Sequence, residues 1–355
     1  MERNYIKLYG DSADPDSAFF LTEGSVYFYL SDSDKYAVTG RNLIVGATEV
    51  IMKHIAGLDA RRIESAVTKD CEAIRKISVD KFMAGMDNYS FILNVSLVLA
   101  KQVQLTNQII TKTFKQLAGD EAKSRELSME YFRIVDRLKT EYAKRKMPWI
   151  NDLVKKYEPS LTFKRGEAYV RSAEPTRITE TTNLSDQLTE YPRGSIICEE
   201  NTVGEEMFIL QTGVIEVLIG GNKVATIEEP GTVTGEMALL LGEPRTATLK
   251  AVNGVVLTKI RKEDLKSVAE KQGEVLKGIS LALARRHYYN AVKIDTLNRS
   301  LVEQRMDASE SKEAKWAAAL AKTAKELTAL KDEVEEVARA RKADFLDDLT
   351  GSFSS

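Results

Sequence analysis

The chain has 355 residues, enough for two or three domains. Its 51 basic and 53 acidic residues nearly balance, so the total charge indicates neither DNA nor an acidic membrane surface as a partner. The two histidines in the chain leave little material for histidine-based catalysis or a metal cluster.

Two features of the composition bear on location. The most apolar run covers ten residues, 91–100, well short of the roughly 20 that span a bilayer, so we expect no membrane insertion. Cys71 and Cys198 lie in apolar, strand-like surroundings, and no signal peptide is recognisable. A reduced, cytoplasmic protein is therefore expected.

The first third of the chain repeats the spacing of a later part. Gly24 and Gly213 lie 189 positions apart, and so do Gly46 and Gly235. After an insertion of six residues the separation becomes 183. A register held over nearly a hundred residues predicts two copies of one structural unit. Later pairs are Arg62 with Arg245, Ile77 with Ile260 and Phe82 with Leu265, and the run 96–101 corresponds to 280–285 at a separation of 184.

Residues 88–157 are predicted to be mainly helical, because apolar residues recur at intervals of three and four. Gly119 interrupts the first helix, Asp120 can cap a second, and Pro148 with Trp149 breaks or bends that one. The two apolar stripes comprise Phe91, Val95, Val98, Leu99, Val103, Leu105, Ile109, Ile110, Phe114 and Leu117, then Leu127, Tyr131, Ile134, Val135, Leu138 and Tyr142.

Residues 157–185 are poorer in large apolar residues and carry Pro159 and Pro175, which indicates a connector. Short apolar or alternating segments then follow at 203–217, 224–227 and 255–260, with glycine turns between them. Many short strands of this kind suggest a jelly-roll barrel.

Residues 235–248 combine an acid, two glycines and an arginine in a turn-and-helix segment. The Glu236 carboxylate can accept hydrogen bonds from vicinal sugar hydroxyls, and Arg245 presents a fork of donors to phosphate oxygens. Residues 238–241 form a short apolar run whose first amide groups can add donors to an anion. Pro244 fixes the turn before the arginine. The pattern predicts a pocket for a small phosphate ester.

This segment resembles the phosphate-binding cassette of the cyclic-nucleotide-binding domain family, the sensor module of catabolite activators, cyclic-nucleotide-dependent kinases and gated channels. The likeness covers about residues 190–292 and includes the runs 191–197, 207–217 and 283–286. It implies a jelly-roll barrel with a long lid helix, cAMP or cGMP as the ligand, and no cofactor.

The resemblance also implies roles for single residues. Glu236 would hold the ribose hydroxyl, Arg245 the cyclic phosphate, and Asn290 falls where the lid helix of the activators touches the base. A hydroxyl such as that of Thr246 favours guanine in some members, yet others with it respond to adenine, so cAMP and cGMP both stay open. The expected ligand-binding residues are Gly235, Glu236, Met237, Ala238, Arg245, Thr246, Ala247 and Asn290, with no catalytic or metal-binding residue.

The first copy differs where the chemistry is decided. Ala47 stands at the position of Glu236, no proline precedes Arg62, and residues 54–58 are inserted. A ribose hydroxyl would have no charged acceptor there, so we expect the first copy to be structural or to bind something else. The alternative is that Glu49 replaces the missing acid, although two residues along a turn it points in another direction.

The C-terminal part is predicted to be a long helix starting near Val275. Leu301 and Leu320 are out of heptad register, which indicates a break near residues 307–312. The later apolar residues fit a coiled coil, and a solitary polar helix is the alternative. Residues 344–355 are expected to be a flexible tail. The heptad seam consists of Leu320, Leu327, Leu330, Val334 and Val337.

Together these patterns predict an α+β protein with two β jelly-roll domains, helical linkers and a long C-terminal helix or coiled coil. The leading hypothesis is a non-enzymatic cyclic-nucleotide sensor that acts through a protein partner or a homo-oligomer formed by its helices. The helix at 97–117 either pairs with another chain or packs on its own domain. The expected domains are 1–87 (degenerate copy), 88–157 (helical), 158–275 (nucleotide-binding), 276–343 (lid helix and coil) and 344–355 (tail).

The alternative function is a structural assembly protein that keeps the barrels as scaffolds and has lost the ligand or given it a secondary role. A DNA-binding activator would need a compact helix-turn-helix domain after Leu297, and the residues there form one polar helix. An enzyme would need a nucleophile, a metal set or a GxxxxGK[ST] loop, and we identify none of these.

Overall fold

The computed structural model describes residues 5–31, 34–69, 73–116, 121–178, 182–306 and 312–341. The chain divides into two compact units: unit 1 contains Met1–Leu105 and Glu174–Tyr288, and unit 2 contains Thr106–Ala173 and Tyr289–Ser355. Both units are therefore discontinuous in sequence. The boundaries differ from the consecutive blocks expected, because helices α3 (Tyr89–Gln116) and α9 (Glu274–Met306) each have residues in both units.

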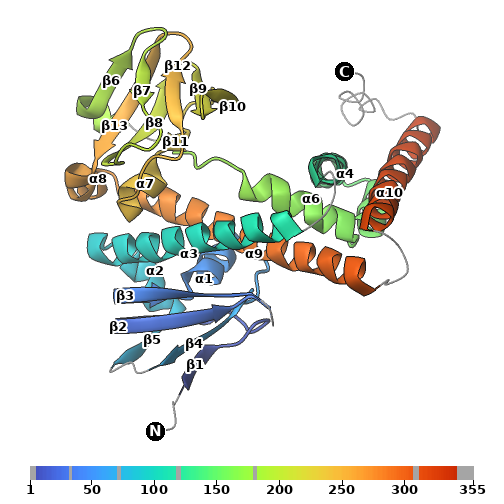
Figure 1. Ribbon diagram of the computed structural model, residues 1–355, viewed down its shortest axis with the longest axis horizontal. Coiled ribbons are helices and arrows are strands. Elements are labelled where there is room, and N and C mark those ends of the chain that lie inside the picture. Colours follow the sequence, from blue (N-terminus) through green and yellow to red (C-terminus); the bar gives the residue numbers. More distant parts are fainter. Residues whose placement is uncertain are drawn as a thin grey trace. The chain divides into compact units, whose positions relative to one another are not determined.

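The first domain of unit 1 is built on one five-stranded antiparallel sheet with the order β1-β4-β2-β3 (Figure 1). Strand β5 pairs with the first half of β2, and β4 pairs with its second half. The elements are β1 (Tyr5–Tyr9), β2 (Ser17–Tyr29), β3 (Lys35–Val45), α1 (Ala47–His54), β4 (Ser65–Lys69), β5 (Ile74–Ser78) and α2 (Val79–Gly85).

This single sheet differs from the jelly roll expected for the first domain, which needs two facing sheets. Gly24 lies inside β2, opposite Gly40 of β3, and the two strands stay paired on both sides of it. The corresponding Gly213 instead ends a strand, at a φ of 103°, where a Cβ atom would lie 2.5 Å from the Gly254 carbonyl oxygen. Because β2 is continuous, strands β3, β4 and β5 all pair with it in one sheet.

The second domain of unit 1 has two four-stranded antiparallel sheets, ordered β10-β9-β12-β7 and β11-β8-β13-β6. Its core includes Phe208, Leu210, Ile215 and Leu257, all buried. Strands β8, β9, β10 and β13 fall in or next to the segments expected from the glycine-punctuated sequence, whereas β6, β11 and β12 lie outside them. The elements are η1 (Thr182–Gln187), β6 (Leu188–Tyr191), β7 (Ile196–Cys198), β8 (Glu206–Thr212), β9 (Ile215–Ile219), β10 (Asn222–Ile227), β11 (Val233–Thr234), α7 (Glu236–Leu241), β12 (Thr248–Ala251), β13 (Val255–Arg261), η2 (Lys262–Asp264) and α8 (Leu265–Lys271).

Helices α3 and α9 lie against each other in unit 1. The hydroxyls of Ser96 and Ser280, both fully buried, are 2.8 Å apart. These serines are equivalent in the internal alignment, so corresponding positions of the two copies meet. Part of the apolar stripe of α3 is thus buried within its own chain, whereas Leu97, Leu105 and Ile109 are half-buried. Pairing of this helix with another chain stays a prediction. Buried members of the stripe are Val95, Val98, Leu99 and Val103.

Unit 2 contains four further helices: α4 (Glu121–Arg145), α5 (Pro148–Tyr157), α6 (Leu161–Ser172) and α10 (Lys312–Ala340). Helix α6 occupies part of the expected connector. The Ser160 hydroxyl caps it by accepting a hydrogen bond from the Phe163 amide at 3.0 Å. A Cβ atom at Gly166 would lie 1.9 Å from the Ser128 carbonyl oxygen, so this glycine lets α6 approach α4 closely. The helix buries Phe163 and Tyr169 together with Thr162, Gly166 and Ala168.

The heptad seam of α10 is used within the chain. Leu327, Leu330 and Val334 are buried in one cluster with residues of α4, α5 and α6, including Tyr131 and Ile150. These three seam residues are therefore covered within the chain, whereas Leu320 and Val337 are half-buried, and a coiled coil with a partner stays a prediction. Several expectations concern positions outside the described residues. These are residues 307–311 of the break expected near 307–312, the tail at 344–355, Cys71, Leu117, Gly119, Asp120 and the Phe114 side chain.

Within the described ranges, no single helix is long and apolar enough to cross a membrane. The bent pair α2 and α3, with an angle of 106° between them, passes that test by length and composition alone.

Candidate functional site

The second cassette, residues 235–248, begins at a position whose backbone conformation favours glycine. Gly235 has φ 83° and ψ 1°, and it directly precedes α7. A Cβ atom there would lie 2.3 Å from Nη1 of Arg245. The glycine therefore provides the left-handed turn and the space for the guanidinium.

Arg245 is buried and held by its backbone. Its amide donates to the Thr202 carbonyl oxygen and its carbonyl oxygen accepts from the Asn201 amide, both at 2.8 Å. The guanidinium carbon lies 5.4 Å from the centre of the Phe208 ring. Nη1 has no hydrogen-bond partner among the described residues, although Arg245 is only 6% exposed. A buried cationic donor without an acceptor fits a site for an anion.

Glu236 is the first residue of α7 and is 5% exposed. Its Oε1 accepts a hydrogen bond from Nη1 of Arg286, on α9, at 3.1 Å. The predicted ribose acceptor therefore already has a cationic partner. Sequence reasoning did not identify this role of Arg286, for which the only signal was a basic residue on the predicted lid helix.

The other expected ligand residues divide into two groups. Met237, Ala238, Thr246 and Ala247 belong to the same cassette, where Ala238 is buried and Thr246 is exposed. Asn290 belongs to unit 2, and its Nδ2 donates to the Thr106 hydroxyl at 3.0 Å and to Oδ1 of Asn107 at 2.9 Å. Both amide hydrogens thus link α9 to α3, and contact with a base stays a prediction.

Cys198 of β7 shows the charge environment near Arg245. Burial raises the pKa of the Cys198 thiol, and the positive charge on Arg245 opposes part of that rise. The thiol is therefore neutral and does not supply the anion that Arg245 lacks.

The first cassette, residues 46–62, has the same turn but a different ion pair. Gly46, with φ 75° and ψ 17°, precedes α1, and a Cβ atom there would lie 2.9 Å from Nη1 of Arg62. That Nη1 donates to Oε2 of Glu49 and to the Gly46 carbonyl oxygen, both at 2.7 Å. Nη2 donates to the Ser17 carbonyl oxygen, and the guanidinium carbon lies 4.2 Å from the Tyr9 ring centre. Glu49 thus neutralises Arg62 and is not free to hold a ribose.

A buried polar network lies beside the first cassette. His287 of α9 places Nδ1 2.7 Å from the Thr48 hydroxyl and Nε2 2.9 Å from the Tyr36 hydroxyl. Tyr36 donates to Glu64 at 2.6 Å, and Gln102 of α3 donates to both. Burial lowers the pKa of His287 to about 3 and raises the pKa of Glu64. The imidazole is therefore neutral, and the chain's own side chains fill this region.

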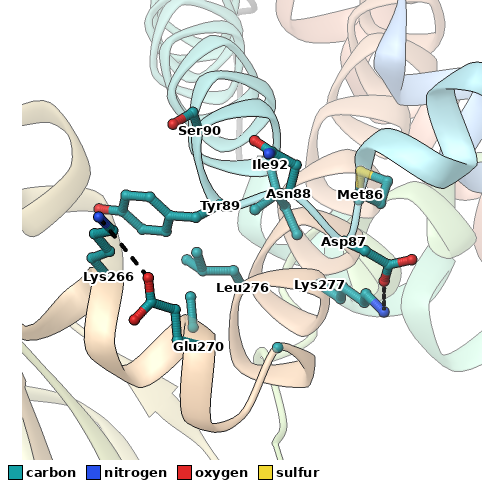
Figure 2. Close-up of a pocket in the computed structure, with 12 residues that line it drawn as sticks. Met86, Asp87, Asn88, Tyr89, Ser90, Ile92, Lys266, Glu270, Leu276 and Lys277 are labelled. Atoms are coloured by element: carbon teal, nitrogen blue, oxygen red, sulfur yellow. Dashed lines mark ion pairs between the residues drawn. The ribbon is translucent and has the colours of Figure 1, made fainter.

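A separate pocket of about 390 Å³ lies where α2 meets α3, next to α8 and α9 (Figure 2). Its two lysines each have a carboxylate partner: Lys277 lies 2.6 Å from Asp87, and Lys266 lies 3.9 Å from Glu270. No residue expected to bind the ligand lines it. With its cations paired, this pocket does not offer the free donors of Arg245.

Comparisons with known proteins concern the same region. A family described as the cyclic nucleotide-binding domain matches residues 188–272. The Pycsar effector protein XpPycTIR of Xanthomonas perforans is 33% identical over 101 residues, which are 28% of this chain and 33% of that protein. A cyclic nucleotide-gated potassium channel of Rhizobium etli is 34% identical over 101 residues, 27% of this chain and 26% of the channel. This chain therefore spans a third or less of these relatives.

Among solved structures, the Thermus thermophilus catabolite activator protein is 23% identical, with a TM-score of 0.31, over 42% of this chain and 81% of that one. The family match and the cassette geometry coincide at β6 to α8. Residues 188–272 of this chain match the cyclic nucleotide-binding domain family, and the second cassette lies within them.

Proposed function

We propose that this protein is a non-enzymatic sensor of cAMP or cGMP. One observation carries the proposal: Nη1 of Arg245 is buried against Gly235 without a hydrogen-bond partner in the part of the chain that the structure describes. A cyclic phosphate supplies the missing acceptors, and the free 2′-hydroxyl of the ribose then meets Glu236, the residue after Gly235. This set of contacts holds a nucleotide and requires no bond to break.

The output in this proposal is a change in the helices, which alters contact with a protein partner or with a second copy in the cytoplasm. Arg286 supports this proposal, because it joins α9 to Glu236, the carboxylate expected to bind the ribose. A ligand shifts such an equilibrium only by its different affinities for the two states. Leu327, Leu330 and Val334 of the α10 seam are covered by α4, α5 and α6. We therefore do not expect these three residues to contact a partner.

The first domain is proposed to be a degenerate copy that binds no cyclic nucleotide. Its support is geometric: Gly46 and Gly235 share the left-handed conformation before a helix, and each lies against the arginine of its own cassette. Among the described residues, the first arginine has a buried carboxylate partner inside its domain, and Nη1 of the second has no partner.

Isothermal titration calorimetry of the full chain with cAMP, cGMP and 5′-AMP tests the proposal. Binding of at least one cyclic nucleotide, and much weaker binding of 5′-AMP, is expected. The comparison between cAMP and cGMP also decides which base is preferred. If neither cyclic nucleotide binds at millimolar concentration, the structural assembly function replaces the sensor.

A further inference from the structure

One face of the five-stranded sheet in the first domain is covered by helices. Val26 and Phe28 of β2 are fully buried. The hydroxyl of Tyr36, on β3, accepts a hydrogen bond from Gln102 of α3 at 3.1 Å and lies 2.9 Å from Nε2 of His287 on α9. Side chains alternate between the two faces of a sheet. The residues between these positions therefore belong to the opposite face, where the side chains are exposed or half-buried.

The strand register places three rows of residues across this opposite face, which we call the outer face. Residues directly opposite each other in paired strands share a face. Two contacts agree with the register. The hydroxyls of Ser25 and Thr39 lie 2.7 Å apart. The ring centres of Tyr5 and Tyr27 lie 6.5 Å apart. The rows are Tyr5, Lys69, Ser25 and Thr39, then Lys7, Val67, Tyr27 and Ala37, then Ser65, Tyr29 and Lys35.

Each row of the outer face carries one tyrosine. Tyr5 and Tyr29 are 54% and 38% exposed. Tyr27 is half-buried and meets Tyr5 edge to face, with 78° between the rings. Single exposed apolar side chains are normal on protein surfaces, but rings in three successive rows form a patch. Proteins bind unpaired bases by stacking them on aromatic side chains, and an open sheet face can present those side chains.

Each row also carries one lysine, and no row contains a carboxylate. In the next row along β2 and β3, Glu23 pairs with Arg41 at 3.2 Å, so this acid does not offset the lysines. Asp11 and Asp34 lie outside the rows, after β1 and before β3. Positive charge of this kind fits a chain of phosphates. From the first row to the third, the lysines are Lys69, Lys7 and Lys35.

We propose that the outer face binds single-stranded nucleic acid, with bases stacked on the tyrosines and phosphates beside the lysines. The combination of rings and charge carries this assignment, because an anionic membrane surface would use the charge but offers no bases to the rings. The near-zero net charge of the chain does not oppose it, since the lysines act locally. This proposal is independent of the cyclic-nucleotide site.

Fluorescence anisotropy of labelled oligonucleotides with the full chain at low salt tests the proposal. The probes are oligouridylate and oligothymidylate of about ten nucleotides, and a duplex of the same length. Single strands should bind and the duplex should bind more weakly, because its bases are already stacked and paired. Binding of either single strand supports the proposal and identifies the preferred sugar. Equal binding of duplex and single strand, or no binding of any probe, would overturn it.

The role of the rings is tested by a pair of double variants. Tyr5→Leu with Tyr29→Leu removes two stacking surfaces, so affinity should fall by about tenfold or more. Tyr5→Phe with Tyr29→Phe keeps both rings and should bind within about threefold of the wild type. Urea unfolding checks that both variants are as stable as the wild type. Similar affinities of the Leu and Phe variants would show that bases do not stack on this face.

The role of the lysines is tested by salt. Three phosphate contacts predict a slope of about −2 in a plot of log K against log salt concentration. Lys7→Ala and Lys35→Ala should each weaken binding and reduce that slope by about 0.7. Lys81→Ala is the control, because Lys81 is exposed on α2 of the same domain but stands outside the sheet. Equal effects at all three lysines would mean that the binding is not confined to the outer face.

Two further outcomes separate the alternatives. If vesicles that contain phosphatidylserine bind the chain and no oligonucleotide does, the face is a membrane contact and the proposal is wrong. Titration with cyclic nucleotides is read separately. A chain that binds cyclic nucleotide but no oligonucleotide keeps the sensor function and loses this inference. A chain that binds single strands but no cyclic nucleotide gives the reverse result.

Discussion

The two cassettes of unit 1 share a backbone conformation and differ in how their arginine and acid are paired. In each, a left-handed glycine precedes a helix and makes room for a buried arginine. In the first, Arg62 is bonded to Glu49, and only its Nε lacks a partner in the described part of the domain. In the second, Nη1 of Arg245 is the unpartnered donor, and the acid is bound to a residue of α9.

The position of one carboxylate accounts for this difference. Glu236 immediately follows its glycine, whereas Glu49 stands three residues after its own. The third residue lies on the first turn of α1, from which its side chain reaches the arginine within the domain. We call the first cassette closed, because its acid pairs with the arginine. We call the second cassette open, because its acid leaves Nη1 of the arginine available to a ligand.

The largest effect should come from breaking the closed cassette. Arg62→Met leaves Glu49, which is 0% exposed, without its partner, and a buried unpaired charge of this kind costs about 3–5 kcal/mol. Urea unfolding should show that loss. Arg41→Met is the control, since the Arg41 and Glu23 side chains are 77% and 66% exposed and such a pair contributes at most about 1 kcal/mol. Equal effects of the two substitutions would show that Arg62 is not a structural residue.

The open cassette should respond in binding and not in folding. Arg245→Ala and Glu236→Ala each remove a charged partner of the ligand, so affinity should fall by about tenfold to a hundredfold. Calorimetric titration measures the loss, with Arg261→Ala, 57% exposed on β13, as a control. If both variants bind like the wild type, the ligand lies elsewhere.

The polar network beside the first cassette predicts a dependence on pH. The folded-state pKa of His287 is about 3, below the unfolded value of about 6.5, so its contribution to stability is complete above pH 6.5 and is lost as the pH falls. Between pH 6.5 and 5 the loss should approach about 2 kcal/mol. The raised pKa of Glu64 acts in the opposite sense, because its contribution falls as the pH rises.

His287→Gln separates the two groups, since it removes the titrating ring and keeps an amide for hydrogen bonding. Urea unfolding at pH 7.5 and pH 5 should show a smaller acid loss in this variant than in the wild type. The same acid loss in both proteins would mean that other groups determine it.

The smallest expected effect is that the first domain binds no nucleotide. With Arg62 neutralised by Glu49, the first domain should add no second nucleotide site, and titration should give one ligand per chain. Arg62→Met should leave that number and the affinity unchanged. Two sites of similar affinity would remove the distinction between the cassettes.

The sequence alone predicted the sheets of the second domain, its cassette residues and the helices from 88 to 157. Those features follow from local signals: glycine turns, a regular apolar period, and an acid and an arginine at fixed spacing. The sequence also indicated the difference between the cassettes, because Ala47 stands at the position of Glu236. The charge and type of the residue at a given position can be determined without knowing the fold.

The tertiary structure decided which groups meet. Glu49 and Arg62 are 13 residues apart, and Glu236 and Arg286 are 50 apart. Leu330 of α10 and Tyr131 of α4 belong to one buried cluster. A heptad pattern predicts only that a stripe of apolar side chains will be buried, and a carboxylate in the sequence predicts only that it needs a hydrogen-bond donor. Which surface or donor satisfies them depends on the path of the whole chain.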